Sequence, residues 1–354
     1  MASCHLRLAL LGTALLLMAC GGPPSASGPA PTPAKPAAVS TAPAAAVPAP
    51  TREPTSVEVG VISITLGYWV NWIGDAKGFF ADEGIHNEIT ATRSMTGGLS
   101  ALTGGSLHLL GGSPTAFIQA IERGADLVAV ASGQRDPVYS LIARPEIQRV
   151  EDLRGRTLAI SALNGGDTVI LRKMLLARGV GENDVEFTLA GGTPERYAAM
   201  VSGGAAGALL SQPQDFQAQA QGYPRLMLST EVLQEYQYNS WVVRRDWAAS
   251  NTDLLLRWLR AYARASHWLT DPANRDEAIA IGAETTKADL DIVRQTYDLQ
   301  MVQLAGRVFP SDPLVSLPGL KVTIDDMVAS GDLPSPPPPP EKYVDNSYLE
   351  RAKG

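Results

Sequence analysis

Four loops rich in glycine, serine and threonine are the segments of this sequence best suited to bind a ligand. Each loop follows a predicted strand and precedes a predicted helix, at residues 63–69, 95–98, 111–114 and 161–168. In parallel α/β sheets, loops of this kind lie beyond the carboxyl ends of the strands, where ligands bind. The helix starts that follow offer free N–H groups and a partial positive charge, which suit anions and polar oxygen atoms. The loops therefore predict a site that recognises a small polar solute.

The candidate ligand-binding residues come mainly from these four loops. They are Thr65, Tyr68, Trp69, Thr96, Gly97, Ser113, Ser161, Asn164, Gly165 and Thr168, with Gln212 and Trp241 further along the chain. Hydroxyl and amide groups there would hold a sulfonate, carboxylate or phosphate. The Trp69 ring would stack on a flat ligand such as a pyrimidine, although a place in the hydrophobic core is an equal alternative. Because no arginine lies inside these loops, an organic ligand with an aromatic or polar head is slightly favoured over a small sulfonate.

The sequence carries no recognisable catalytic motif. It lacks HExxH, GxSxG, the phosphate-binding GxxxxGK[ST] and a GxGxxG that opens a helix after a strand. Both cysteines, Cys4 and Cys20, lie within the first twenty residues, and the four histidines share no metal-ligand spacing. The net charge of −7 excludes a strongly basic nucleic-acid binder. We therefore predict a binding protein that is not an enzyme and needs no metal or other cofactor.

Residues 1–19 are predicted to be a lipoprotein signal peptide. The apolar run at residues 8–18 follows a short basic start and is too short to cross a bilayer as a helix. The segment Leu17-Met18-Ala19-Cys20 resembles the bacterial lipoprotein cleavage box, which predicts that Cys20 is lipidated. The mature protein would then be exported and held on the cell membrane, facing the periplasm or the exterior. A plain secretory signal with an incidental cysteine is the alternative.

Proline marks the limits of the folded body. Residues 20–56 form a tether rich in proline and alanine without an apolar period, and residues 331–354 form a proline-rich C-terminal tail. Between them, short apolar strands such as residues 57–64 alternate with helical patterns such as residues 253–269. This alternation predicts parallel sheets and an α/β fold.

Several motifs, in this order, resemble those of the periplasmic substrate-binding proteins of ABC importers for nitrate, sulfonates, taurine and thiamine-precursor pyrimidines. Residues 72–85, which contain Gly78-Phe79-Phe80, are similar to the opening "G-F-F" helix of that family. Residues 150–157 resemble its "D-L-K-G-K" entry to a second lobe, and residues 202–208 its "G-x-V-D-A" run without the acidic residue. The resemblance covers about residues 57–298.

The resemblance implies a two-lobed α/β fold of the type II periplasmic binding proteins, with a ligand cleft between the lobes. Lobe 1 would combine residues 57–143 with 239–330, and lobe 2 would hold residues 144–238, with hinge crossings near 143 and 239. Closure of the lobes would bury the ligand.

The function that the resemblance implies is a lipid-anchored solute-binding protein that delivers a small organic solute to the permease subunits of an ABC importer. The solute would be a sulfonate- or nitrate-like anion, or a thiamine-precursor pyrimidine or other aromatic compound. A lipid-anchored sensor that signals to a membrane receptor is an alternative. A pyrimidine synthase-like enzyme of the same fold is less favoured, because that enzyme relies on a cysteine-rich motif and this chain has no cysteine after Cys20.

Overall fold

The computed structural model describes residue 28 and residues 54–163 and 165–354 of the 354-residue chain. The predicted signal peptide, the predicted lipidation site Cys20 and most of the predicted tether lie outside these residues. Within residues 54–163 and 165–354, no helix combines the length and the apolar character needed to cross a membrane.

The first lobe is built on a five-stranded sheet with the strand order β2-β1-β3-β10-β4. Its strands are β1 (Thr55–Val61), β2 (Ile85–Ala91), β3 (Leu109–Gly112), β4 (Leu127–Gln134) and β10 (Asn239–Arg244). Strand β1 runs parallel to β2 and β3, whereas β10 runs antiparallel to both of its neighbours.

The second lobe repeats this plan with the strand order β7-β6-β8-β5-β9. Its strands are β5 (Ser140–Ala143), β6 (Thr157–Ile160), β7 (Glu186–Leu189), β8 (Gly207–Leu210) and β9 (Arg225–Leu228). Here β5 is the antiparallel strand, between β8 and β9. Strands β5 and β10 are the first strands after the chain changes lobe. No crossover helix precedes either strand, and a parallel neighbour would need one. Both strands therefore run antiparallel to their neighbours, and each sheet is mixed.

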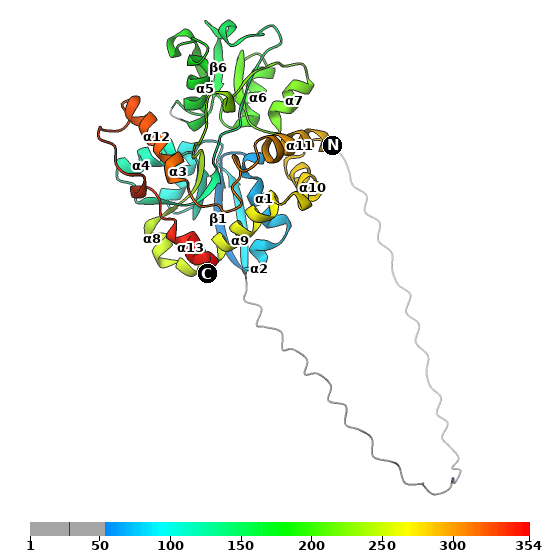
Figure 1. Ribbon diagram of the computed structural model, residues 1–354, viewed down its shortest axis with the longest axis vertical. Coiled ribbons are helices and arrows are strands. Elements are labelled where there is room, and N and C mark those ends of the chain that lie inside the picture. The colour runs from blue at the N-terminus through cyan, green and yellow to red at the C-terminus, as the bar shows by residue number, and fades with distance from the viewer. Residues whose placement is uncertain (1–27, 29–53, 164) are drawn as a thin grey trace, which may run out of the picture. The chain divides into compact units, whose positions relative to one another are not determined.

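Helices cover both faces of each sheet, and the two lobes lie one above the other in Figure 1. Apolar side chains on one face of the first sheet form one core with α1 (Trp69–Ala76), α2 (Phe79–Asp82), α9 (Thr252–Thr270), α10 (Arg275–Thr286), α11 (Leu290–Tyr297) and α13 (Ser347–Lys353). Those on its other face form a core with α3 (Met95–Thr103), α4 (Pro114–Glu122) and α12 (Leu317–Ala329). The second sheet packs against α5 (Gly166–Leu176) on one face and against α6 (Thr193–Val201) and α7 (Gln214–Ala220) on the other. The two lobes confirm the predicted two-lobed α/β fold.

The chain passes between the lobes twice, at residues 135–139 and at residues 229–238. The predicted boundary at residue 143 falls one strand too late, because β5 pairs with β8 and β9 of the second lobe. Strand β5 is a short, fully buried apolar run like β4, and such a run fits either sheet equally well.

The C-terminal residues complete the first lobe and are not a free tail. Tyr343 and Leu349 are fully buried, and Val344 forms a β-bridge with Ala129 of β4. Helix α13 packs against α9. The sequence alone does not predict that the chain packs against the first lobe again after the proline run at residues 336–340. The apolar positions that follow this run are few and widely spaced.

We expect Leu349→Ala to lower the free energy of unfolding by about 2 kcal/mol, because it removes a fully buried side chain from the core between α13 and α9. Leu176→Ala is the matched control, since the Leu176 residue is 70% exposed and its removal should change stability by less than about 0.5 kcal/mol. Urea unfolding of both variants measures the difference. Equal stabilities would show that the C-terminal segment adds nothing to the fold.

Candidate ligand-binding site

A largely enclosed cavity of about 60 Å³ lies between the two lobes. The first lobe lines it with the loops after β1 and β3 and with the end of β4, and the second lobe lines it with the loops after β6, β7 and β8. Its polar lining consists of Ser63, Thr65, Tyr68, Ser113, Gln134, Tyr139, Ser161, Asp167, Thr193, Arg196, Ser211, Gln212, Tyr238 and Asn239. The cavity therefore lies at the carboxyl ends of strands from both sheets, where α/β proteins bind ligands.

Helices from both lobes begin at the cavity wall. Ser113 precedes α4, Gly165 precedes α5 and Gly192 precedes α6, and all three residues line the cavity. Backbone N–H groups in the first turn of a helix have no acceptor within that helix and carry partial positive charge. Three helix N-termini around one cavity favour the binding of an anionic group there.

A buried ion pair forms part of the second lobe's wall. Arg196 Nη1 lies 3.1 Å from Asp167 Oδ2, and the two side chains are only 3% and 9% exposed. The guanidinium also donates hydrogen bonds to the carbonyl oxygens of Leu209 and Gly191, and Ser161 Oγ donates to the Asp167 carboxylate at 2.5 Å. Because the two charges neutralise each other, the pair shapes the wall without adding net charge to the cavity.

Three tyrosine residues, Tyr68, Tyr139 and Tyr238, line the cavity. Tyr139 Oη and Tyr238 Oη are 2.7 Å apart and belong to the two crossings. Tyr68 Oη donates to the Gly111 carbonyl oxygen at 3.1 Å. Burial raises the pKa of all three hydroxyl groups above the ordinary value for tyrosine. They are therefore neutral O–H groups at physiological pH.

Half of the sequence-predicted site residues come together in this cavity. They are Thr65, Tyr68, Ser113, Ser161, Gly165 and Gln212. Asn164, which was predicted to bind the ligand through its amide, lies outside the described residues. The indole N–H of Trp72 donates to the Thr65 carbonyl oxygen at 2.9 Å and so fixes the first loop against α1.

Three other predicted site residues lie away from the cavity. Thr96 and Gly97 are exposed in the first turn of α3, and Ser94 Oγ accepts the Gly97 N–H. Thr168 is fully buried, and its hydroxyl donates to the Ala162 carbonyl oxygen. These residues shape the loops rather than line the cavity.

The structure places the two predicted tryptophan contacts in the hydrophobic core. Trp69 is fully buried, and its indole N–H donates to the Ala278 carbonyl oxygen. Trp241 packs against Trp258 and Tyr262, with ring centroids 5.3 and 5.7 Å apart. The apolar face of α1 and the buried strand β10 must pack against the helices beside them. We therefore exclude Trp69 and Trp241 from the proposed site.

Arg196, Gln134 and Asn239 also line the cavity, although they are not among the residues predicted from the sequence. A signal for Arg196 exists, because Gly191-Gly192-Thr193-Pro194 repeats the pattern of residues 111–114 and opens α6 in the same way. Gln134 and Asn239 lie opposite each other at the ends of β4 and β10. Only the sheet pairing brings them to the cavity.

The two lobes touch around the cavity, so the structure is in a closed arrangement. The Leu66 N–H of lobe 1 donates to the Gln212 carbonyl oxygen of lobe 2 at 3.1 Å. A Cβ atom on Gly166 of lobe 2 would lie 2.4 Å from Ser113 Oγ of lobe 1. On another side, Lys173 of α5 forms an ion pair with Asp326 of α12.

Among the described residues, no group of three or more histidine, cysteine, aspartate or glutamate side chains could hold a metal ion. The cavity wall offers hydroxyl, amide and backbone N–H groups instead. Such a wall can recognise and hold a small polar solute.

Two α/β lobes, joined by two crossings and closed over a polar cavity, define the fold of the periplasmic binding proteins. The chain belongs to the family described as NMT1/THI5 like, whose family model matches residues 71–275.

Several known proteins are similar to this chain in sequence or in fold. A curated relative of Bacillus subtilis (strain 168), named as a binding protein, YtlA, is 21% identical over 299 residues, which are 79% of this chain and 85% of the relative. The periplasmic nitrate-binding protein NrtA from Synechocystis PCC 6803 has a TM-score of 0.70 at 15% identity, over 85% of this chain and 88% of NrtA. The alkanesulfonate-binding protein SsuA from Xanthomonas axonopodis pv. citri, bound to MOPS, has a TM-score of 0.65 at 17% identity, over 80% of this chain and 96% of SsuA. At these identities the solved structures establish the fold.

Proposed function

We propose that this protein is an extracytoplasmic solute-binding protein, which captures a small acid between its lobes and delivers it to the permease subunits of an ABC importer. The observation that carries the proposal is the polar cavity between the lobes, at which helices of both lobes begin. A ligand that contacts both lobes binds the closed form better than the open form, and that difference in affinity drives closure. The closed shape is then the signal that a permease can recognise.

The cavity favours a small acid over an aromatic ring. Its volume of about 60 Å³ is well below the roughly 150 Å³ of an apolar cavity that accepts benzene. The rings of Trp69 and Trp241 are packed in the core and offer no stacking surface. Backbone N–H groups and hydroxyl groups suit the oxygen atoms of a nitrate, sulfonate or carboxylate. NrtA is named a nitrate-binding protein and SsuA an alkanesulfonate-binding protein, which agrees with this class of ligand.

Isothermal titration of the purified protein with nitrate, methanesulfonate, taurine and a 4-aminopyrimidine tests the ligand class. We expect heat of binding for at least one of the small acids and none for the pyrimidine. Chromatography after many hours should recover the bound acid unchanged, because we assign the site to binding rather than turnover. Binding of the pyrimidine alone, or a steady release of product, would contradict the proposal.

We also propose that Cys20 carries the lipid anchor. The motivation is the apolar run that ends in Leu17-Met18-Ala19-Cys20, and acyl chains there would hold the protein on the membrane through about 0.8 kcal/mol per buried CH₂. In a bacterial host, we expect Cys20→Ala to leave the precursor unprocessed and free of radioactive palmitate. Cys4→Ala serves as the control and should be labelled like the wild-type protein. Equal labelling of Cys20→Ala and wild type would contradict the assignment.

A further inference from the structure

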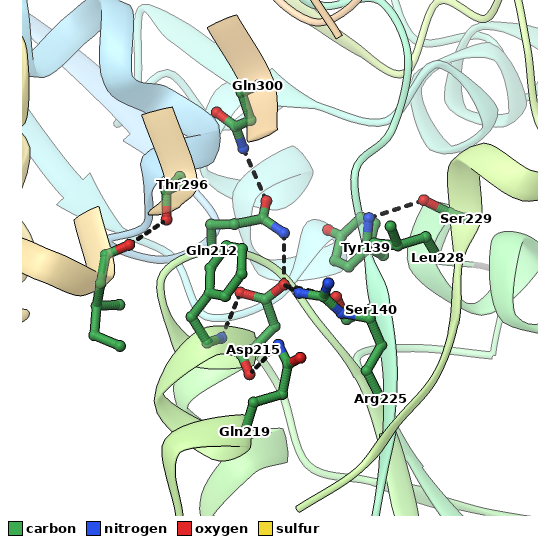
Figure 2. A network of polar contacts seen from close by, with 12 residues as sticks. Tyr139, Ser140, Gln212, Asp215, Gln219, Arg225, Leu228, Ser229, Thr296 and Gln300 are labelled. Carbon is green, nitrogen blue, oxygen red and sulfur yellow. Dashed lines mark hydrogen bonds and ion pairs between the residues drawn. The ribbon is translucent and has the colours of Figure 1, made fainter. Parts of the chain in front are cut away.

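A chain of buried amide groups crosses from one lobe to the other at the edge of the cavity. Gln300 Nε2 of lobe 1 donates to Gln212 Oε1 of lobe 2 at 2.8 Å, and Gln212 Nε2 donates to Asp215 Oδ2 at 2.8 Å. Figure 2 shows Gln212 between the other two side chains. Both glutamines are only 1% exposed. Gln212 lines the cavity, whereas Gln300 lies behind it, in the π-helical turn η6 (Asp298–Gln303) that continues α11.

Asp215 fixes this chain to the second lobe. Its carboxylate is fully buried and accepts further hydrogen bonds from Ser140 Oγ at 2.6 Å and from Arg225 Nη2 at 3.1 Å. Ser140 is the first residue of β5, so the carboxylate is held directly beside the first crossing. With its Nε2 on Asp215 and its Oε1 on Gln300, the Gln212 amide is held in one orientation. A primary amide has two N–H donors, and Asp215 needs only one, so a ligand in the cavity can accept the other.

We propose that Gln300 is a latch that holds the lobes closed on the solute through its hydrogen bond to Gln212. Gln212 and Gln300 belong to different lobes, so this bond forms when the lobes close and breaks when they open. Because Gln212 lines the cavity, the residue that the latch holds is also part of the wall around the solute. Gln300 is thus a positioning residue that couples occupancy of the cavity to closure. The kind of solute in this inference rests on the proposed function. The effect of Gln300 on closure rests only on the contact between the lobes.

Removing the latch should affect the closed form more than the open form. In the open form, water can satisfy the Gln212 amide. In the closed form of Gln300→Ala, Gln212 Oε1 would remain buried, with its partner from lobe 1 removed. The loss of one such hydrogen bond corresponds to a closed fraction that is about 3- to 10-fold smaller. A purely structural role for Gln300 would lower stability without changing closure.

A disulfide trap measures closure without needing a known ligand. The chain has only two cysteines, Cys4 and Cys20, so Cys4→Ser and Cys20→Ser give a full-length parent without thiols. Ser63→Cys and Gly192→Cys then place one thiol on each lobe, because a Cβ on Gly192 would lie 3.1 Å from Ser63 Cβ in the closed form. Disulfides bridge Cβ atoms about 3.5–4.5 Å apart, which a small relaxation of the loops provides. The rate of oxidation reports how often the lobes are closed.

We expect Gln300→Ala to slow trapping about 3- to 10-fold relative to the parent with the same two thiols. Gln303→Ala is the matched control, since Gln303 is exposed in the same turn and should leave the rate unchanged. Trapping of Gln300→Ala at the parent rate would overturn the latch. A parent that cannot be trapped would also overturn it, because the closed form in which the bond exists would not be reached.

Titration of the wild-type protein separates the latch from the proposed function, because Ser63 and Gly192 line the cavity and the two thiols could disturb the solute. If neither nitrate nor methanesulfonate nor another small acid binds the wild-type protein while Gln300→Ala still traps slowly, the latch stands and the ligand class is wrong. If a small acid binds the wild-type protein and Gln300→Ala traps at the parent rate, the function stands and the latch is wrong.

Discussion

We expect the Gly166→Val variant to fold like the wild-type protein and to bind its solute about 100-fold more weakly. Gly166 is buried in the first turn of α5, at the point where lobe 2 meets lobe 1. A Cβ there would lie 2.4 Å from Ser113 Oγ and 2.8 Å from Ser113 Cβ, closer than side-chain atoms can approach. The lobes must therefore separate, and the solute loses its contacts with one of them. Each lobe keeps its own core, so stability should change little.

Three further variants show whether the effect of Gly166→Val comes from the contact between the lobes. In a Gly166→Ala variant, the added Ser113→Gly change removes the two Ser113 atoms that the new Cβ would meet and leaves only Tyr238 Cε2 at 3.4 Å, so the double variant should regain part of the affinity that Gly166→Ala loses. Gly181→Val changes a glycine of the same lobe whose Cβ would meet only the Asp184 side chain, at 3.6 Å or more, and should bind normally. Isothermal titration of the wild-type protein and of the four variants gives their affinities. Wild-type affinity in Gly166→Val would show that closure at this contact is not needed for binding.

Arg196→Ala should lower the free energy of unfolding by about 3–5 kcal/mol, because it leaves the Asp167 carboxylate buried without its partner. The same change removes the donors to the Leu209 and Gly191 carbonyl oxygens. Arg178→Ala is the matched control, since Arg178 pairs with Glu231 at the surface and its removal should cost less than about 1 kcal/mol. Urea unfolding measures both. If Arg196→Ala were no more destabilising than Arg178→Ala, the pair would not hold the cavity wall.

The fold was predictable from the sequence wherever local patterns agree with the tertiary structure. Helix α9 begins and ends within one residue of the predicted range 253–269, because its apolar residues form one stripe that can pack on the core. The segment around Gly78-Phe79-Phe80, which resembles one opening helix, is divided instead between α1 and α2, since Gly78 adopts a left-handed conformation between them. The assignment of β5 and of the C-terminal segment to their lobes depends on long-range pairing, which no local pattern records.

The candidate site was predictable in outline and not in its side chains. The loops at strand ends, including those of Ser113 and Ser161, do meet at one cavity. Trp69 was ambiguous because a tryptophan at the start of a helix can face either the loop or the core, and packing against α10 and α11 decides for the core. Arg196 lies on a helix that no predicted loop included, and its place at the cavity depends on how the second sheet is paired.

The most direct test of solute capture is native mass spectrometry of the wild-type protein and Gly166→Val, each purified from the cells that naturally make it. Our account predicts that wild type carries one additional small mass, which fragments as an organic or inorganic acid. Gly166→Val should carry none, because its lobes cannot close over the cavity. The same bound mass on both proteins, or an aromatic base on wild type, would contradict the claim that a small acid is held between the closed lobes.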